Sequence, residues 1–396
     1  MRRASSVLGF LVLSVLLATS CLSAPARDNR TGVTDTEVLV GNWSPQSGAA
    51  ASYGVVALGT DAYFKYVNDQ GGIYGRKIKY LIEDDAYQPA RTVAVVKKMV
   101  EQDGVFAFVG GLGTATNMAV KDYIVQHKVP NVGYATGSTA LAYPPNPYFF
   151  ALQTNYDIES RLLTRYAIDD LKAKRIGVIY QNDAFGVEGR DGILDELKNS
   201  GVEPAIVISY ETTDTDFSSH AIKLRESAAD VVILWSIPKP TALLLKEAEK
   251  IGFRPHWVSS TTNVDPIMFD TAGQAWDGAI VATWLPPFDS PDPKVSFYRE
   301  VFKKYYPDRP LGQFSEIGFA YGQLFVEGLQ RAGKDLNRES FIKAMESIKD
   351  WNGSLAFNVS YSPEDRQGQQ AVAFARANLS TRSYEVFTDF RQYGKK

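Results

Sequence analysis

The stretch from residue 105 to residue 145 carries one local pattern twice, and this repeat restricts the fold more than any other feature of the chain. In each copy a short apolar run, 105–109 and then 129–132, leads into a loop of small and hydroxyl-bearing residues. A strand that ends in such a loop and feeds a helix presents free backbone N–H groups at the edge where open parallel sheets bind ligands. Two such loops in succession predict one small ligand that bears a carboxylate.

Strand-like and helix-like segments alternate regularly over most of the chain. Continuous apolar runs such as 175–180 and 230–235 indicate strands buried on both faces. This alternation is typical of an α/β protein with parallel sheets covered by helices. The length of 396 residues fits about two domains. Pro-rich stretches at 143–147 and 285–293 mark places where the chain is expected to change domain.

The strand–helix alternation stops after two long helical segments, 295–306 and 315–332. Its short apolar runs, 356–359, 370–377 and 384–389, predict three short strands separated by turns.

The N-terminus has the pattern of a secretory signal over residues 1–20, with a basic start, a short apolar core and small residues before a cleavage point. Cys21 follows directly and is the sole cysteine of the chain, so no internal disulfide can form. The sequence around Cys21 resembles the lipobox of bacterial lipoproteins, which implies a lipid-anchored, extracytoplasmic protein. The alternative is an ordinary secretory signal with an incidental cysteine. Residues 21–34 are expected to form a tether.

Composition excludes several classes of protein. Hydrophobic residues make up 45% and charged residues 22%, as in soluble globular proteins, and the formal net charge of -3 gives no indication of a nucleic-acid surface. No Cys/His cluster indicates a metal site, and no cofactor is expected.

An ordered set of short motifs resembles the type I periplasmic binding proteins of the branched-chain amino acid (Leu/Ile/Val) group. The motifs are 32–37 before the first strand, 44–48 after it, Tyr53-Gly54, 68–76, Asp84-Asp85, Gly110-Gly111 with Thr114, 135–141 and 182–186. The resemblance covers nearly all of the chain after Thr31, in the same order.

The resemblance implies two Rossmann-like lobes joined by a hinge of three crossings, closing on a ligand. Lobe one is expected over 35–152 plus 286–350, and lobe two over 153–285 plus 351–396. The implied function is that of a monomeric solute receptor, not an enzyme, which delivers its ligand to the permease subunits of an ABC importer. A sensor that uses the same fold to report its ligand to a membrane receptor is the alternative.

The candidate ligand-binding residues follow from the loops and from the resemblance. Short residues let the backbone approach a carboxylate, and aromatic residues form walls. The candidates are Trp43, Tyr53, Gly113, Thr114, Ala135, Thr136, Gly137, Ser138, Phe185, Trp235 and Thr262. Each aromatic among them is also compatible with ordinary packing.

The chain departs from the family pattern at the position that binds the amino group of the ligand. Amino-acid binders of the group use an acidic residue after the strand that matches 255–260, but the sequence here runs through Thr262 and Asn263 without a carboxylate. An ammonium buried without a countercharge is costly. Either Asp183, Asp265 or Glu316 substitutes, or the ligand carries no ammonium, and we favour a small carboxylic acid, an amide or an aromatic compound.

Two enzyme classes fit the sequence poorly. The run 111–116 has two of the three glycines of a dinucleotide-binding fingerprint, but Thr116 stands at the third place and no acidic residue follows at the ribose position. No G-x-S-x-G nucleophile elbow is present, and the three histidines lie in unrelated contexts.

Overall fold

The computed structural model describes residues 29–394. The expected signal segment 1–20 and Cys21 lie outside these residues. The last part of the expected tether is packed on the protein, since the Arg338 N–H donates to the Asn29 carbonyl (2.9 Å) and the Leu39 N–H donates to the Gly32 carbonyl (2.8 Å). Within 29–394, no helix is both long and apolar enough to cross a membrane.

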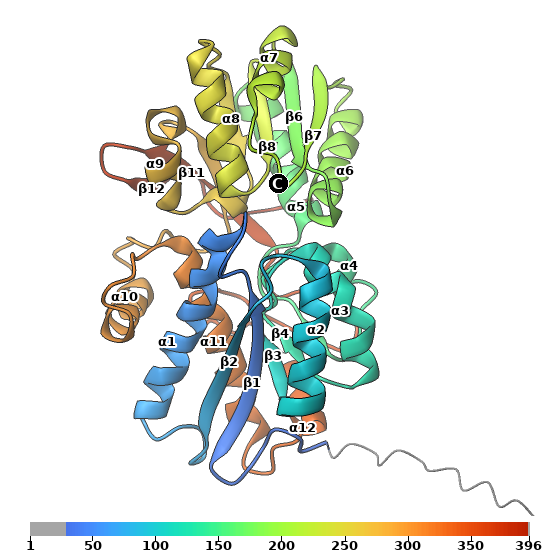
Figure 1. Ribbon diagram of the computed structural model, residues 1–396, viewed down its shortest axis with the longest axis vertical. Coiled ribbons are helices and arrows are strands. Elements are labelled where there is room, and N and C mark those ends of the chain that lie inside the picture. Colours follow the sequence, from blue (N-terminus) through green and yellow to red (C-terminus); the bar gives the residue numbers. More distant parts are fainter. Residues whose placement is uncertain (1–28, 395–396) are drawn as a thin grey trace, which may run out of the picture.

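The chain forms two α/β lobes, one above the other in Figure 1. Lobe one holds a five-stranded parallel sheet in the order β2-β1-β3-β4-β5. Its strands are β1 (Glu37–Ser44), β2 (Lys77–Asp84), β3 (Ala107–Val109), β4 (Asn131–Val132) and β5 (Phe149–Phe150). Its helices are α1 (Gly54–Asp69), α2 (Pro89–Lys98), α3 (Thr114–Gln126), α4 (Thr139–Ala142), α10 (Pro293–Tyr305), α11 (Gln313–Ala332) and α12 (Arg338–Glu346).

Lobe two holds an eight-stranded sheet whose main path runs β12-β11-β10-β9-β8-β6-β7, with β13 paired to β11. Its strands are β6 (Ile176–Gln181), β7 (Ile206–Tyr210), β8 (Val231–Trp235), β9 (His256–Ser259), β10 (Ile280–Thr283), β11 (Ala371–Asn378), β12 (Ser383–Val386) and β13 (Arg391–Gln392). Its helices are α5 (Tyr156–Arg165), α6 (Ala184–Asn199), α7 (Ser218–Glu226), α8 (Pro238–Lys250) and α9 (Ile267–Thr271). The strands β6 to β10 are parallel, and β11 runs antiparallel to β10.

The expected alternation and the two-lobed α/β fold are confirmed, and the sequence explains the layers. Every residue of β8 is buried, because helices cover both faces of this central strand. Two helices of lobe two begin with side-chain caps: the Asn155 side chain accepts a hydrogen bond from the Ile158 N–H at α5, and Asp183 accepts one from the Gly186 N–H at α6.

Three segments cross between the lobes, and the first and third are bonded to each other. The first crossing passes Leu152 and Gln153, the second follows Trp284, and the third passes Gln369. The Gln369 N–H donates to the Leu152 carbonyl (2.8 Å), and the Gln367 side-chain amide donates to the Gln153 carbonyl (2.6 Å). The first and third crossings therefore form one paired unit of the hinge.

The third crossing lies about twenty residues later than the expected boundary at residue 350. Residues 351–369 stay on lobe one, where the Tyr361 hydroxyl donates to the Ala151 carbonyl (2.6 Å) and the Ala151 N–H donates to the Arg366 carbonyl (3.0 Å). The expected strand at 356–359 is not formed; Val359 makes an isolated bridge to Trp351. The apolar residues of this segment pack on lobe one instead of joining a sheet.

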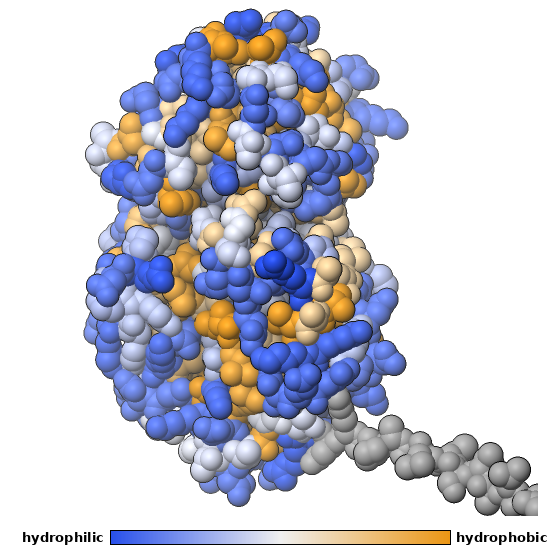
Figure 2. Space-filling view, viewed as in Figure 1, coloured by the Kyte–Doolittle hydropathy of each residue, from blue (hydrophilic) through white to orange (hydrophobic). Residues whose placement is uncertain are grey.

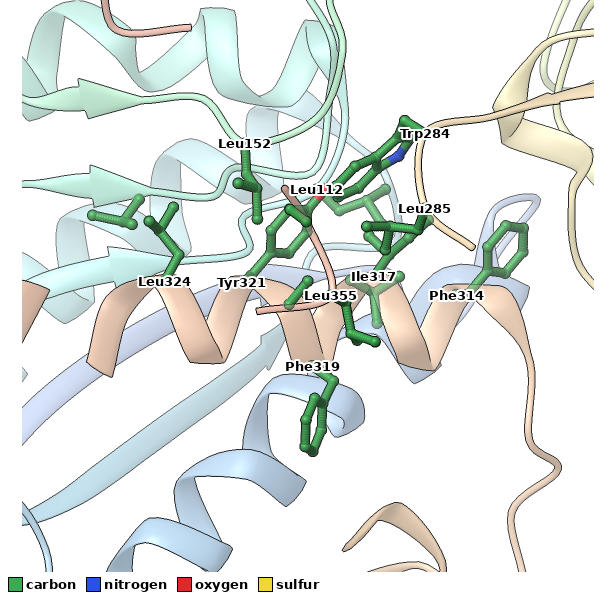
Figure 3. Close-up of a cluster of buried hydrophobic side chains, with 14 of the residues drawn as sticks. Leu112, Leu152, Trp284, Leu285, Phe314, Ile317, Phe319, Tyr321, Leu324 and Leu355 are labelled. Carbon is green, nitrogen blue, oxygen red and sulfur yellow. The ribbon is translucent and has the colours of Figure 1, made fainter. Parts of the chain in front are cut away.

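Helix α11 is the central packing element of lobe one. It buries residues on nearly all sides, with Tyr321 and Leu324 on the sheet side and Phe319 towards α1 (Figure 3). Glycines let α1 and α11 approach closely: a Cβ added at Gly318 would lie 1.8 Å from the Val56 carbonyl oxygen. The Thr60 hydroxyl donates to the Gly318 carbonyl (2.7 Å) across the same contact.

Gly318→Ala is expected to destabilise the protein, because the added methyl group must push α1 and α11 apart. Overpacking of this kind costs about 1–3 kcal/mol. Gly322→Ala on the same helix is the matched control, since its Cβ would find its nearest neighbours at 3.2 Å. Urea unfolding should show a loss for Gly318→Ala and little change for Gly322→Ala; equal stabilities would contradict the assigned helix contact.

Candidate functional site

A cavity of about 60 Å³ lies between the two lobes. Its lining comprises Tyr53, Val56, Tyr87, Leu112, Gly113, Thr114, Ala135, Gln153, Tyr156, Phe185, Ile237, Thr261, Thr262, Trp284, Phe314, Ile317 and Tyr321. On this measure one water needs at least about 10–15 Å³, so the cavity admits a compact ligand of several non-hydrogen atoms.

The lining comes mainly from loops at the carboxyl ends of strands in both sheets. In lobe one these loops follow β1, β2, β3 and β4, and in lobe two they follow β6, β8, β9 and β10. The hinge and the first half of α11 supply the rest. Because parallel strands share one carboxyl edge, short loops bring residues far apart in sequence to one place.

Six of the sequence candidates line the cavity: Tyr53, Gly113, Thr114, Ala135, Phe185 and Thr262. Gly113 adopts a φ of 101°, and its backbone leads directly into the first turn of α3. A side chain at Gly113 would strike the Tyr87 ring at 2.5 Å, so the small residue is needed for this close approach. The roles of these six candidates in ligand binding stay predictions.

Thr136, Gly137 and Ser138 lie behind the lining and hold the two repeated loops together. The hydroxyls of Thr114 and Thr136 are 2.7 Å apart, and the Ser138 N–H donates to the Thr136 hydroxyl (3.2 Å). Gly137 is packed against lobe two, where an added Cβ would lie 2.5 Å from the Thr154 carbonyl oxygen. These residues shape the site from its second layer of atoms.

The two tryptophan candidates support the lining rather than form it. Trp43 is fully buried behind the Gly110-Gly111 turn, edge-on to Phe108 at 5.1 Å. Trp235 is also fully buried, and its indole N–H donates to the Phe185 carbonyl (3.0 Å). The two rings stack at 5.7 Å, so Trp235 fixes the position of Phe185.

The structure adds several aromatic residues that the sequence reasoning missed. Tyr87 and Trp284 each follow a strand end, and that signal was present in the sequence. Tyr156 begins α5 directly after the first crossing. Tyr321 lies inside α11 and donates its hydroxyl proton to the Gln153 side chain (2.9 Å). No local pattern distinguishes such a helix residue from ordinary core.

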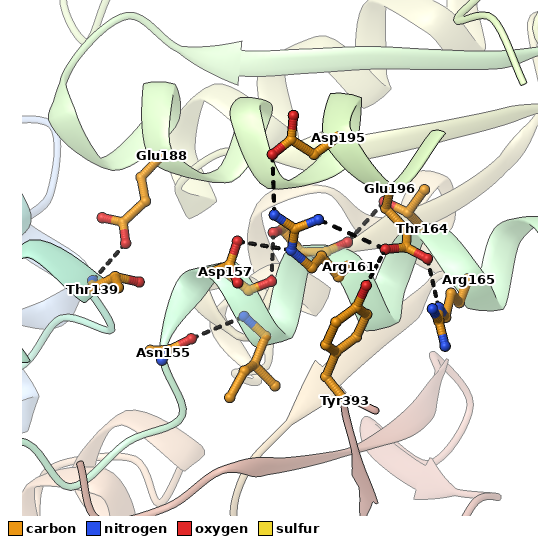
Figure 4. Close-up of polar contacts among 12 residues, drawn as sticks. Thr139, Asn155, Asp157, Arg161, Thr164, Arg165, Glu188, Asp195, Glu196 and Tyr393 are labelled. Carbon is orange, nitrogen blue, oxygen red and sulfur yellow. Dashed lines mark hydrogen bonds and ion pairs between the residues drawn. The ribbon is translucent and has the colours of Figure 1, made fainter. Parts of the chain in front are cut away.

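Three polar contacts join the lobes around the cavity. The Tyr53 hydroxyl donates to the Thr262 carbonyl (2.7 Å), and the Phe314 N–H donates to the Asp265 carboxylate (2.9 Å). At the opposite side the Thr139 N–H donates to Glu188 (2.5 Å), as Figure 4 shows. The lobes are therefore closed on each other, with a visible waist between them in Figure 2.

No carboxylate is among the residues of 29–394 that line the cavity. Asp183 caps α6 and also accepts from the Gln181 side chain (2.6 Å). Asp265 lies at the lobe junction, where burial raises its pKa to about 6. Glu316 is fully buried on α11 and accepts from Gln313 (2.6 Å), and burial raises its pKa.

Glu159 is a further buried carboxyl that sequence reasoning did not single out. It lies in the first turn of α5 and has no exposed surface. One oxygen accepts a hydrogen bond from the Thr261 N–H (2.7 Å), and the other has no partner within the described residues. Burial raises the pKa of Glu159 to about 8, so the group is mostly neutral at pH 7. Glu159 therefore holds the cavity loop at Thr261 without bringing a full charge.

The residues at this cavity suit capture of a small molecule. Among residues 29–394, no group of His, Cys, Asp and Glu is placed to hold a metal ion. The lining is aromatic and aliphatic with a few hydroxyl, amide and backbone groups, and both lobes contribute.

The architecture, with a cavity between two hinged α/β lobes, is that of the periplasmic binding proteins. The model of the periplasmic binding protein family matches residues 37–383, and the chain belongs to this family. Within it, the chain is a type I solute-binding protein of the branched-chain amino acid group. The family consists of extracytoplasmic solute receptors.

Known proteins of this kind resemble the chain over most of its length. The Leu/Ile/Val-binding protein homolog 1 of Brucella suis biovar 1 is 25% identical over 301 residues, which cover 75% of this chain and 78% of that protein. A branched-chain amino acid ABC transporter protein from Thermus thermophilus with bound valine superposes with a TM-score of 0.83 at 18% identity, covering 91% of this chain and 98% of the other. A fatty acid ABC transporter substrate-binding protein from Thermomonospora curvata gives 0.83 at 23% identity, covering 92% and 94%.

Glu159→Gln is expected to change how stability depends on pH. Burial raises the pKa of Glu159 in the folded protein to about 8, whereas the unfolded chain has a value of about 4.3. The native carboxyl therefore favours folding most below pH 4.3, and this contribution is lost as the pH rises towards 8. The variant should gain stability relative to the natural protein between pH 5 and 8, by on the order of a few kcal/mol.

Urea unfolding at pH 5, 6.5 and 8 measures this difference. Glu203→Gln, at an exposed position, is the control and should follow the natural protein at every pH. Parallel curves for Glu159→Gln and the natural protein would contradict the buried, protonated state of Glu159.

Proposed function

We propose that this protein is the solute receptor of an ABC importer, which captures a small carboxylate- or amide-bearing ligand between two closing lobes and presents it to a permease. The observation that carries the proposal is the cavity itself, because both lobes line it and polar contacts between the lobes close around it. An enclosed ligand contacts both lobes and therefore stabilises the closed state over the open one.

Closure has a concrete structural basis in the proposal. The first and third crossings are bonded to each other, so the hinge permits relative movement of the lobes while each sheet stays intact. Tyr53 on lobe one and Thr262 on lobe two meet across the cavity, and their hydrogen bond exists only when the lobes are together. Thr114, at the start of α3, offers a hydroxyl and helix N-terminal N–H groups to an anionic ligand.

The proposal includes an anchor on the outer face of the cell membrane. Residues 1–20 would direct secretion, and Cys21 would carry the lipid. The first described residues pack at the end of lobe one opposite the cavity, near α12 (Figure 1). An anchor joined there leaves the lobes and their cavity free to meet a permease.

The double variant Thr114→Ala with Tyr53→Ala is expected to lose ligand affinity by at least about tenfold, equal to 1.4 kcal/mol, without unfolding. Calorimetry against leucine, valine, phenylalanine, 3-phenylpropanoate, benzoate and benzamide would establish which of them the natural protein binds and how the variant differs. Thr215→Ala with Tyr74→Ala, at exposed positions, is the control. Unchanged affinity in the Thr114/Tyr53 variant would show that the cavity is not the binding site.

Cys21→Ala is expected to release the protein from the membrane without affecting ligand binding, because the lipid would be attached to this thiol. Fractionation of cells that express the full chain, followed by a binding assay on the soluble fraction, measures both effects. Ser23→Ala should remain in the membrane fraction. Continued membrane retention of Cys21→Ala would contradict the anchor.

A further inference from the structure

We propose that the ligand is a compact aromatic monocarboxylate that carries no ammonium group. This inference rests on the proposed function, because it names the class of solute that the receptor captures. It comes from the shape, the charge and the unpartnered polar atoms of the cavity.

The apolar part of the cavity is predominantly aromatic. Seven of its lining residues carry aromatic rings: Tyr53, Tyr87, Tyr156, Phe185, Trp284, Phe314 and Tyr321. Tyr53 and Phe314 are 4.5 Å apart, and Tyr156 lies edge-on to Phe185 at 5.2 Å. Walls of this kind favour a flat ring, which gains edge-to-face and stacking contacts beyond simple burial.

Two lining residues carry buried polar atoms that lack a protein partner. The Trp284 indole nitrogen and the Thr261 hydroxyl have no hydrogen-bond partner within residues 29–394, and the residues are 1% and 4% exposed. Buried polar groups are normally paired, so both atoms point to a ligand with polar atoms of its own. The indole N–H can only donate, and it therefore requires an acceptor such as a carboxylate oxygen.

The electrostatics favour an anion and disfavour an ammonium. Thr114 begins the 13-residue helix α3 at the cavity, so the positive end of the helix dipole faces the ligand. No lining residue is an Asp or Glu. Of the nearby carboxyls, Asp183 caps α6, and Glu159 accepts from the Thr261 backbone through one oxygen. The other Glu159 oxygen has no partner within residues 29–394, and burial raises the pKa of this carboxyl, which favours its neutral form. A zwitterionic amino acid would bury its ammonium without a countercharge at this site.

The test compares acids with partners that either carry an additional α-amino group or have an amide in place of the carboxylate. Isothermal titration calorimetry on the mature natural protein would measure 3-phenylpropanoate against phenylalanine, 4-methylpentanoate against leucine, and benzoate against benzamide. We expect each acid to bind at least tenfold more tightly than its α-amino partner, the aromatic acids to bind more tightly than 4-methylpentanoate, and benzoate to bind more tightly than benzamide.

Three variants test the physical cause. Thr262→Glu places a carboxylate on the cavity wall and should reverse the preference, so that phenylalanine binds more tightly than 3-phenylpropanoate. Thr262→Gln has the same size without the charge and should keep the natural order. Trp284→Phe retains a ring but removes the N–H donor, and it should weaken binding of the acid about tenfold with an unchanged ring preference.

The outcomes separate the inference from the proposed function. Leucine or phenylalanine binding as tightly as its des-amino partner would overturn the inference and leave the receptor function standing. The inference would also fall if the natural protein bound an amino acid and either Glu159→Gln or Asp183→Asn abolished that binding. If no acid, amide or amino acid of the panel binds, both the inference and the proposed function fail.

Discussion

The approach of two carboxyl edges of parallel sheets across one hinge is the constraint on which the rest of the structure depends. Each edge ends in short loops that expose backbone and small side chains, and the bonded crossings hold the two edges face to face. The cavity, the meeting of Tyr53 with Thr262 and the start of α3 at Thr114 all follow from that arrangement.

Desolvation decides what such a site can hold. Closing the lobes removes water from the cavity, so each polar group there must find a partner or lose stability. In lobe two, one oxygen of Glu159 meets this requirement by its bond to the backbone of the cavity loop, and burial raises the pKa of this carboxyl. Desolvation disfavours an ammonium that has no countercharge at this site. It also disfavours an unpaired Trp284 N–H, which a ligand acceptor would satisfy. The same fold occurs in a fatty acid transporter protein and in a branched-chain amino acid transporter protein with bound valine. Selectivity within this fold therefore comes from a few side chains.

The repeated unit at 105–145 was sufficient to find one part of the cavity wall. Gly113, Thr114 and Ala135 lie where small residues after successive strands were expected, because parallel strands bring their ends to one edge. Trp43 and Trp235 also follow or end strands, yet both are fully buried behind the lining. An aromatic residue at a strand end can point into the cavity or into the layer of helices, and that choice depends on neighbours distant in sequence.

By itself, the sequence determined the alternation of strands and helices, the two lobes and the loops that meet at the site, since these follow from local periodicity and turn chemistry. The tertiary structure alone decided that 351–369 belongs to lobe one and that Tyr321 and Phe314 of α11 form cavity wall. It also decided that Glu159 is buried against Thr261 rather than exposed on a helix. These outcomes depend on packing between segments hundreds of residues apart, and no local pattern encodes which faces will meet.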